Sequence, residues 1–350
     1  MSTNSLKLGL STGLLSGRAS LSEALDTVKE AERLGFDSVW ASETYGSDAL
    51  TPLAWWGSHT EKVRLGTTIV QISARRPTAT AMAAMTMDHL SSGRFMLGLG
   101  VSGPQVVEGW YGEPFAKPLA RMREYVSIVR DVFARREPVS SEGPHYPLPV
   151  RDREGITGLG KPLKSILQPL RDRIPIYIAA EGPKNIALAA EIGDGWLPLY
   201  YSPYYDAELY RPCLEEGFAR RGGQPDQFEI APSIPFIVHD DVEQAADLLR
   251  PMYALYFGGM GARQMNFHHQ VVVRMGYEAE AKKIQDLYLD GKKDEAAAAV
   301  PTKLVEELAL IGPPEKIRHD LEAWRDSPVT TILIAGPAER LQQAAEIVLG

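Results

Sequence analysis

Residues 63–99 read VRLGTTIVQISARRPTATAMAAMTMDHLSSGRFMLGL. Within this stretch, the β-branched run at 63–72 predicts a long strand, 77–90 predicts a helix, and 95–99 predicts the next strand. A strand, a helix and a strand in this order indicate parallel strands that are joined by a helical crossover.

The same alternation continues on both sides of this stretch. Further strands are expected at residues 6–11, 38–41, 174–179, 195–199, 230–238 and 330–334, and further helices at 20–35, 51–60, 119–135, 184–192, 204–221 and 337–349. Eight strands with interleaved helices predict an α/β fold of the (β/α)8 TIM barrel type, which typically needs about 250 residues.

The chain of 350 residues is longer than a minimal barrel. Length alone suggests two domains, but α/β barrels routinely exceed the usual domain size as one unit. We expect a single barrel domain over residues 1–350. The surplus falls into a Gly- and Pro-rich loop after the fourth strand, at 138–173, and a helical insertion before the eighth strand, at 242–326.

A doubly wound sheet is the main alternative fold, because Gly98, Gly100 and Gly103 match the G-x-G-x-x-G spacing after a strand. In the dinucleotide fingerprint the third glycine sits inside an opening helix. Here Pro104 follows at once, and the glycine-rich stretch 109–112 comes before any expected helix. The motif also lies on the fourth strand rather than the first, so the sequence favours the barrel.

The composition excludes several classes of function. The chain has 37 basic and 45 acidic residues, a net charge of −8, which argues against a nucleic-acid binder. The single cysteine, Cys213, allows no internal disulfide and no Cys-based metal site. No apolar run reaches the roughly 20 residues of a membrane span, and residues 1–15 lack a secretory pattern. We therefore expect a cytoplasmic protein without a metal, nucleic-acid or membrane partner.

Active sites of such barrels form at the C-terminal ends of the strands. The turn from Ala180 to Asn185 is the most informative, because Gly182 permits a tight bend and Pro183 suits a first helical turn. The free amides at a helix N-terminus, with Lys184 nearby, bind phosphate. The alternative is an ordinary turn, and Glu181 would repel an anion unless it points away.

Other candidates have equally plain alternatives. Glu43 follows the second strand and suits a general acid or base, a cofactor contact, or a structural salt bridge. Arg75 and Arg76 suit an anionic tail or a solvated loop, as do Lys161 and Lys164. The seven histidines form no ligand cluster. His268 and His269 are neighbours, so at most one faces a pocket.

Several stretches in the expected order resemble one family. They are residues 31–43 (AERLGFDSVWASE), 63–69 with 74–77, 90–100 (LSSGRFMLGLG), and 175–183 (PIYIAAEGP) with 193–196 (GDGW). Together they span most of residues 6–240, and 310–317 is similar to the C-terminal end of the same pattern. The pattern resembles the bacterial luciferase-like superfamily, most closely its F420-dependent oxidoreductases of actinobacterial type.

The resemblance implies a barrel that binds coenzyme F420, or FMN as the alternative, is usually a homodimer and acts on a small-molecule substrate. It implies hydride transfer between the deazaflavin C5 and an unidentified small organic substrate. The alternatives are an FMN-dependent monooxygenase and a non-catalytic cofactor-binding protein. It also implies a cis peptide at Thr68–Ile69 against the cofactor ring. The implied cofactor-binding residues are Glu43, Thr68, Ile69, Val101, Ser102, Gly103, Ala180, Glu181, Gly182, Pro183, Lys184 and Asn185.

One departure from the family pattern concerns the catalytic group. Sugar-phosphate dehydrogenases of this family have Ser-Asp-His after the second strand, whereas this chain has Ser42-Glu43-Thr44. Thr44 therefore replaces a catalytic histidine, and the proton donor is expected to be Glu43, a loop histidine or water. The acidic residue expected after the first strand in methylenetetrahydromethanopterin reductases is also replaced, by Ser11-Thr12-Gly13.

Overall fold

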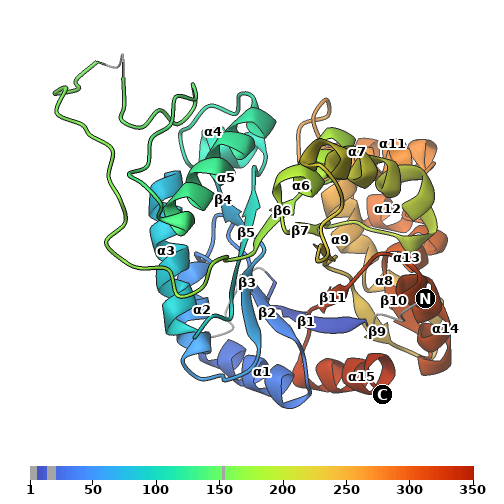
Figure 1. Cartoon of the computed structure of the whole chain (residues 1–350). Helices are drawn as coiled ribbons and strands as arrows, with labels where there is room; N and C mark the ends of the chain where they lie inside the picture. The colour runs from blue at the N-terminus through green and yellow to red at the C-terminus, as the bar shows by residue number, and fades with distance from the viewer. Residues whose placement is uncertain (1–5, 14–20, 152–153) are drawn as a thin grey trace.

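Parallel strands form the centre of the molecule (Figure 1). The computed structural model describes residues 6–13, 21–151 and 154–350; Ser20 of the first expected helix and residues 152–153 of the long loop lie outside the described residues. Within the described residues, nine strands make one sheet in the order β11-β1-β2-β3-β5-β6-β7-β8, with β4 paired to β5. They are β1 (Lys7–Ser11), β2 (Ser38–Ala41), β3 (Arg64–Thr67), β4 (Val70–Gln71), β5 (Phe95–Gly100), β6 (Ile176–Ala179), β7 (Gly195–Leu197), β8 (Glu229–Ile230) and β11 (Thr331–Ile334).

The two ends of this sheet meet and close the barrel. Ser233, just after β8, forms a parallel bridge with Leu333 of β11. The Thr330 amide donates to the Ile230 carbonyl at 3.0 Å, and the Ile234 amide donates to the Leu333 carbonyl at 2.9 Å. The expected (β/α)8 barrel is thus confirmed.

Two expected strands differ in the structure. The expected strand at 63–72 is split into β3 and β4 by a cis peptide between Thr68 and Ile69, the bond that the family resemblance predicted to be cis. The expected strand at 230–238 is wrong as one element. After β8 the chain leaves the barrel, and β9 (Phe236–Val238) pairs instead with β10 (Leu310–Gly312) in a separate sheet. Pro232 and Pro235 lack the amide hydrogens that a continuous ladder needs.

Helices surround the barrel and follow the strands as expected. They are α1 (Leu21–Arg33), α2 (Leu50–Gly57), α3 (Pro77–Leu90), α5 (Pro118–Ala134), α6 (Pro183–Ile192), α7 (Arg211–Arg221), α14 (Pro314–Asp326) and α15 (Ala338–Val348). A short helix, α4 (Pro104–Gly109), begins directly after Gly103, although the sequence analysis placed no helix there. The glycine motif therefore does open a helix, and it is the closed strand order that excludes a doubly wound sheet.

Side chains fill the interior of the barrel. Trp40 and Tyr177 meet edge to face with their ring centroids 5.3 Å apart, within a cluster completed by Met96, Leu197, Ala231 and Leu333. Glycines make room for these rings, since a Cβ on Gly66 would lie 2.3 Å from the Trp40 ring. A ligand of cofactor size can therefore bind only at an end of the barrel.

The segment between β9 and β10 is a helical unit with its own apolar core. It holds α8 (Val242–Asp247), α9 (Arg250–Ala254), α10 (Phe267–Arg274), α11 (Glu278–Leu289), α12 (Lys293–Ala298) and α13 (Thr302–Leu308), in yellow to orange in Figure 1. Rings such as Tyr253 and Phe257, stacked at 5.4 Å, lie at its centre together with Tyr200 from the barrel. This shared core fixes the unit beside the strand ends.

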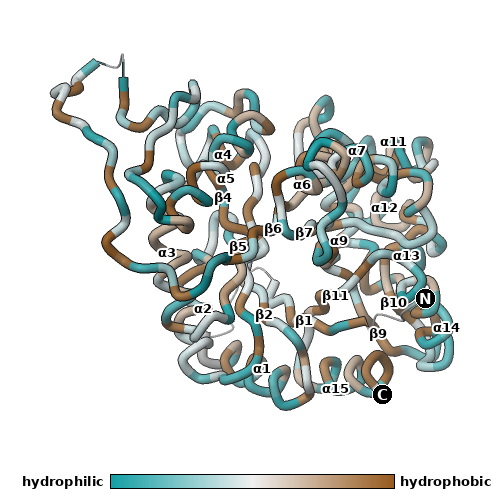
Figure 2. The backbone as a smooth tube through the Cα atoms, in the orientation of Figure 1, coloured by the Kyte–Doolittle hydropathy of each residue, from teal (hydrophilic) through white to brown (hydrophobic). Residues whose placement is uncertain are grey.

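The loop over 138–173 extends away from the barrel on the side of α3 (Figure 1). Several apolar side chains along it are strongly exposed, among them Leu159 at 84%, Leu163 at 69% and Ile166 at 94%. Figure 2 shows several brown, hydrophobic segments along the projecting tube. Among the helices that the structure describes, none has the length and apolar character to cross a membrane.

Candidate active site

The N-terminal end of the barrel is closed by a group of paired charges. The Arg64 guanidinium contacts Asp37 at 2.5 Å and Glu229 at 2.8 Å, and its Nη1 donates to the Tyr177 hydroxyl at 3.5 Å. Burial alone would lower the pKa of Arg64, but the hydrogen bond to Glu229 and the surrounding acidic groups raise it well above its ordinary value. These groups satisfy one another and leave no exposed reactive group.

At the opposite end, Glu43 is buried directly after β2, with 6% of its surface exposed. Glu43 Oε1 accepts from the Arg75 guanidinium at 2.6 Å, and Oε2 accepts from the backbone N–H of Gln71 at 3.1 Å. Both carboxylate oxygens are therefore already occupied by donors. Of the alternatives weighed for Glu43, this geometry favours the structural salt bridge over the proton donor.

The cis peptide lies beside Glu43. The Glu43 amide donates to the Ile69 carbonyl at 3.2 Å, and the Thr68 amide donates to the Ala41 carbonyl at 2.8 Å. The Ile69 side chain occupies the space above Gly100, where a Cβ would lie 2.7 Å from its Cδ1. The peptide of Thr68 and Ile69 is thereby fixed between β2 and β5 at the mouth of the barrel.

The next strand end supplies the turn from Val101 to Gly103. Ser102 has a φ of +59°, in the left-handed region, and Gly103 is the extended residue that precedes α4. All three residues are half-buried. The turn therefore presents mostly backbone to the mouth, as expected for residues that would line a flat ring.

The turn after β6 leads into α6 as the sequence predicted. The Asn185 and Ile186 amides donate to the Gly182 carbonyl at 2.9 Å, and the Trp196 indole donates to the Ala180 carbonyl at 2.8 Å. A Cβ on Gly182 would meet nothing within 4 Å in the part of the chain that the structure describes. The first turn of α6, which includes Pro183 and the exposed Lys184, therefore opens onto free space.

Glu181 is turned toward the helical insertion. Its Oε1 lies 2.8 Å from Nδ1 of His268, near the start of α10, and its carbonyl accepts from Arg274 at 2.7 Å, at the end of the same helix. The carboxylate is thus engaged by His268 rather than left to repel an anion at α6. The sequence could not place Arg274 here, because it lies 93 residues away in a separate segment.

Aromatic side chains surround the mouth from both sides. His268 lies 5.5 Å from Tyr200, which follows β7, and 5.2 Å from Tyr256 of the insertion, measured between ring centroids. Phe115, from the segment after β5, meets Phe267 at 6.4 Å. The insertion therefore reaches over the strand ends and supplies part of the wall of the mouth.

Two buried polar atoms at the mouth support a test of fit for a flavin-like cofactor. Gln71 Nε2 donates to the carbonyls of Glu43 and Thr44, both at 3.2 Å, which fixes the orientation of the amide. Gln71 Oε1 and Asn185 Oδ1 have no hydrogen-bond partner within the described residues. Buried polar atoms are normally paired, so each of these oxygens can accept a hydrogen bond from a bound ligand. The N–H donors of a pyrimidine ring edge suit Gln71 Oε1. Asn185 Oδ1 likewise needs a donor, so a phosphate at this turn would bind to the helix N-terminus rather than to this oxygen.

The other basic candidates are placed differently from one another. Arg75 is committed to Glu43, whereas Arg76 precedes α3 and forms no ion pair with any described residue. Lys161 is exposed on the long loop, and Lys164 donates to the Arg136 carbonyl at 2.8 Å. Arg76 is thus the better placed of these residues for an anionic tail outside the mouth.

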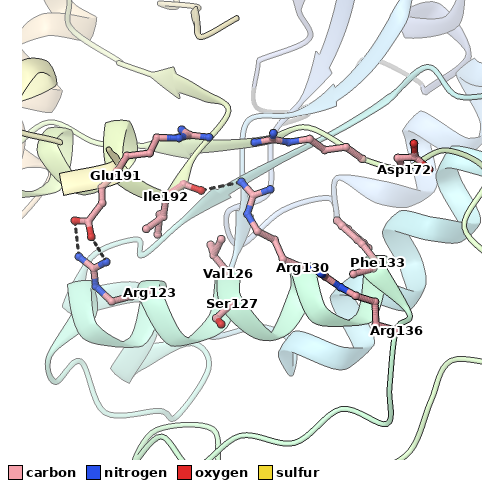
Figure 3. A pocket seen from close by; sticks show the side chains of 12 residues that line it. Arg123, Val126, Ser127, Arg130, Phe133, Arg136, Asp172, Glu191 and Ile192 are labelled. Atoms are coloured by element: carbon pink, nitrogen blue, oxygen red, sulfur yellow. Dashed lines mark hydrogen bonds and ion pairs between the residues drawn. The ribbon is translucent and has the colours of Figure 1, made fainter. Parts of the chain in front are cut away.

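A second depression lies between α5 and the C-terminal end of α6 (Figure 3). This arginine cleft of about 570 Å³ is lined by Arg123, Arg130, Arg136, Arg173 and Arg221, among others. Arg130 and Arg221 bond the carbonyls of Ile192 and Gly193 at 2.8 and 2.5 Å, and both lie near Asp194. Cations stabilise a helix C-terminus in this way, so the cleft has a structural explanation.

No group of three or more His, Cys, Asp or Glu residues suited to a metal ion occurs in the described ranges. The histidine near the mouth, His268, has Glu181 as its acidic partner, while its neighbour His269 is held by Asn266 through its backbone amide at 3.0 Å.

Comparisons with known proteins show the family to which the chain belongs. The family model described as luciferase-like monooxygenase matches residues 5–331. The chain is 52% identical over 346 residues to a Mycobacterium tuberculosis protein named "Putative coenzyme F420-dependent oxidoreductase Rv3520c", covering 98% of this chain and 99% of that protein.

Two solved structures have the same fold. The F420-dependent tetrahydromethanopterin reductase from Methanopyrus kandleri superposes with a TM-score of 0.77 at 22% identity, covering 99% of this chain and 98% of that one. An F420-dependent secondary alcohol dehydrogenase in complex with an F420-acetone adduct superposes with a TM-score of 0.77 at 19% identity, covering 98% of both chains.

Proposed function

The chain belongs to the luciferase-like monooxygenase family, and we propose that within this family it is an F420-dependent oxidoreductase. In the proposed reaction, a hydride passes between C5 of the deazaflavin and a carbon atom of a small organic substrate. The observation that carries the choice of cofactor is the 52% identity, over nearly the whole chain, to a relative named for F420.

The mouth of the barrel offers suitable groups for this cofactor. The first turn of α6, from Gly182 to Asn185, would hold the phosphate through the Lys184 backbone N–H, the helix dipole and the Lys184 side chain, because Pro183 has no N–H and the Asn185 N–H donates to the Gly182 carbonyl. The peptide of Thr68 and Ile69 would support one face of the ring, with Val101, Ser102 and Gly103 beside it. Gln71 Oε1 would accept from an N–H of the ring edge.

The bound deazaflavin supplies the hydride chemistry, and the protein supplies binding and orientation. Glu43, bonded by Arg75 and Gln71, would hold its negative charge close to the cofactor. The aromatic walls of the mouth, including Tyr256 and Phe115, favour a substrate with an apolar body. Enones, imines, ketones and alcohols are the substrate classes to be screened.

Calorimetric titration of the purified protein with F420, and separately with FMN, tests the choice of cofactor. We expect F420 to bind at least 100-fold more tightly than FMN. Tight binding of FMN with weak binding of F420 would instead support the alternative, an oxygen-using flavin monooxygenase. Binding of neither would contradict the phosphate site at α6. Anaerobic reoxidation of reduced F420 by enones, imines or ketones, and reduction of oxidised F420 by alcohols, then test turnover and separate an enzyme from a non-catalytic binding protein.

We also propose that the protein is a homodimer. The exposed apolar side chains of the 138–173 loop continue onto α3, where Met82 and Leu90 are 61% and 64% exposed. Apolar surface of this extent commonly marks a protein–protein contact. Light scattering after size exclusion should give twice the mass of the chain for the wild type. The double variant Leu159→Glu/Ile166→Glu should shift this toward one chain, and a monomeric wild type would contradict the proposal.

A further inference from the structure

We propose that His268, held by Glu181, is the residue that exchanges a proton with the substrate during hydride transfer. This inference rests on the proposed function and assigns a catalytic group that the residues after β2, with Thr44 in the place of a histidine, do not provide. It is carried by the position of His268 over the barrel, its contact with Glu181, and the engagement of the competing groups.

Contacts with two neighbouring strand ends place His268 at the mouth. Its ring lies 5.5 Å from Tyr200, which follows β7, and 5.2 Å from Tyr256, which itself packs against Tyr200 at 5.9 Å. Its Nδ1 lies 2.8 Å from Glu181, on the turn after β6. His268 is thus held beside the C-terminal ends of β6 and β7, which are adjacent in the barrel.

The contact with Glu181 determines what the imidazole can do. With Nδ1–H donated to the Glu181 carboxylate at 2.8 Å, Nε2 is the ring nitrogen left for proton exchange. Nε2 has no hydrogen-bond partner among the residues that the structure describes, and the side chain keeps 20% of its surface exposed. A carboxylate that orients an imidazole and stabilises its protonated form is the arrangement by which proteins build a general acid–base group.

The other candidate donors at the mouth are less suited. Both oxygens of Glu43 already accept hydrogen bonds, from Arg75 and from the Gln71 amide. Burial raises the pKa of Tyr200 and of Tyr256, which makes both phenols weaker acids. The Tyr111 hydroxyl donates to the Thr44 carbonyl at 3.2 Å. Compared with these groups, His268 has a ring nitrogen that is accessible and has no partner in the described part of the chain.

The step balances for reduction of a C=O or C=N bond. The new C–H bond would form with a hydride that bound reduced F420 would supply, and the π electrons of the double bond would move to the heteroatom. The Nε2–H bond of the imidazolium breaks as the new O–H or N–H bond forms, which leaves a neutral imidazole with Nδ1–H still on Glu181. For an alcohol or amine substrate, the neutral Nε2 accepts the proton in the reverse direction.

The charged and titratable groups around His268 come from three sides. Glu181 lies on the turn after β6, Tyr200 after β7, and Tyr256 and Arg274 on the insertion, with Arg274 bonded to the Glu181 carbonyl. Loss of His268 should therefore lower kcat strongly, while Glu181→Gln, which removes only the partner that orients the ring, should lower kcat by a smaller factor.

The experiment compares His268→Gln, His268→Ala and Glu181→Gln with the wild type and with His319→Gln, which removes an 81% exposed imidazole from α14. The acceptor is the imine or ketone that the wild type reduces fastest. We expect kcat to fall about 100- to 10,000-fold in both His268 variants, which is the usual contribution of general acid–base catalysis. F420 affinity and Tm should stay within the range of the His319→Gln control, and added imidazole should restore part of the activity of His268→Ala.

A second readout needs no cofactor. Side-chain nitrogen NMR, with His268 assigned by comparison with His268→Gln, should show mainly the Nδ1–H tautomer of His268 in the wild type. In Glu181→Gln, this tautomer should no longer be preferred. Full activity of the His268 variants with F420 still bound would overturn this inference alone, as would an Nε2–H tautomer in the wild type. Failure of the wild type to bind F420 or to turn over any of the enones, imines, ketones and alcohols would overturn the proposed function, and this inference with it.

Discussion

The two ends of the barrel differ in how their polar groups are paired. At the N-terminal end, Arg64 lies between Asp37 and Glu229, and each charge faces a partner. At the C-terminal end, Gln71 and Asn185 keep buried oxygens without partners in the described residues, and the space beside Gly182 is open. The comparison separates a stabilising end from a ligand-binding end, as in other barrels of this type.

The largest expected effect is at the N-terminal end. Arg64→Met leaves Asp37 and Glu229 without their shared cation, and breaking such a partly buried pair costs about 3 kcal/mol of unfolding free energy. Urea unfolding should show this loss, while the affinity for F420 stays unchanged in the folded protein. Arg33→Met, which breaks an exposed pair with Glu30, is the control and should change stability by less than about 0.5 kcal/mol. Equal effects of the two variants would contradict the comparison.

The next effect contrasts two glycines. Gly66→Ala would place a methyl group 2.3 Å from the Trp40 ring in the filled interior, so we expect a loss of about 2 kcal/mol from overpacking. Gly182→Ala meets open space at a φ of −82° and should leave the unfolding midpoint nearly unchanged. Thermal unfolding of the pair provides the measurement. A destabilised Gly182→Ala with a tolerated Gly66→Ala would reverse the assignment of filled and open ends.

The mouth should respond in affinity rather than in stability. Gly182→Val fills the space at the first turn of α6 and should weaken F420 binding about tenfold or more, equivalent to about 1.4 kcal/mol. Calorimetric titration measures this effect. Gly112→Val cannot serve as the control, because Gly112 has a φ of +65° and a valine there would strain the backbone. Lys184→Gln serves better, since it should weaken binding by a smaller factor without changing the shape of the turn. Wild-type affinity in Gly182→Val would exclude the phosphate site.

The smallest expected effect is on acid stability. Burial would raise the pKa of Glu229, but the hydrogen bond and charge of Arg64 lower it below its ordinary 4.5. A carboxylate with a lowered pKa contributes stability above pH 4.5, and that contribution is lost as the pH falls through the folded-state pKa. Between about pH 5 and 3, the unfolding free energy of Glu229→Gln should therefore fall less than that of the wild type, by on the order of 1 kcal/mol, and its Tm curve should be shallower. Parallel Tm curves for variant and wild type would argue against this linkage.

Local patterns were sufficient to predict the barrel and the turn at α6, because strand, helix and turn signals are short in sequence. The family resemblance predicted the cis bond at Thr68–Ile69, which the structure confirms. The seventh strand was wrong because the apolar run around 230–238 outweighed Pro232 and Pro235.

The pairing of Glu181 with His268 could not be predicted, since it joins residues 87 positions apart through a helical insertion. The same holds for Arg274. Adjacent histidines showed that at most one could face a pocket, but only the packing of α10 against the strand ends determines which one contacts Glu181. Contacts between an insertion and its host fold leave little local trace in a sequence.

A crystal structure of the complex with F420 shows most directly whether the C-terminal end of the barrel binds the cofactor. We expect the cofactor phosphate to lie on the first turn of α6, at Gly182 to Asn185, and the deazaflavin ring to lie against the peptide of Thr68 and Ile69. His268 should face the substrate side of the ring. F420 bound in the arginine cleft near Arg130, or outside the mouth altogether, would contradict the assignment of the C-terminal end as the ligand-binding end.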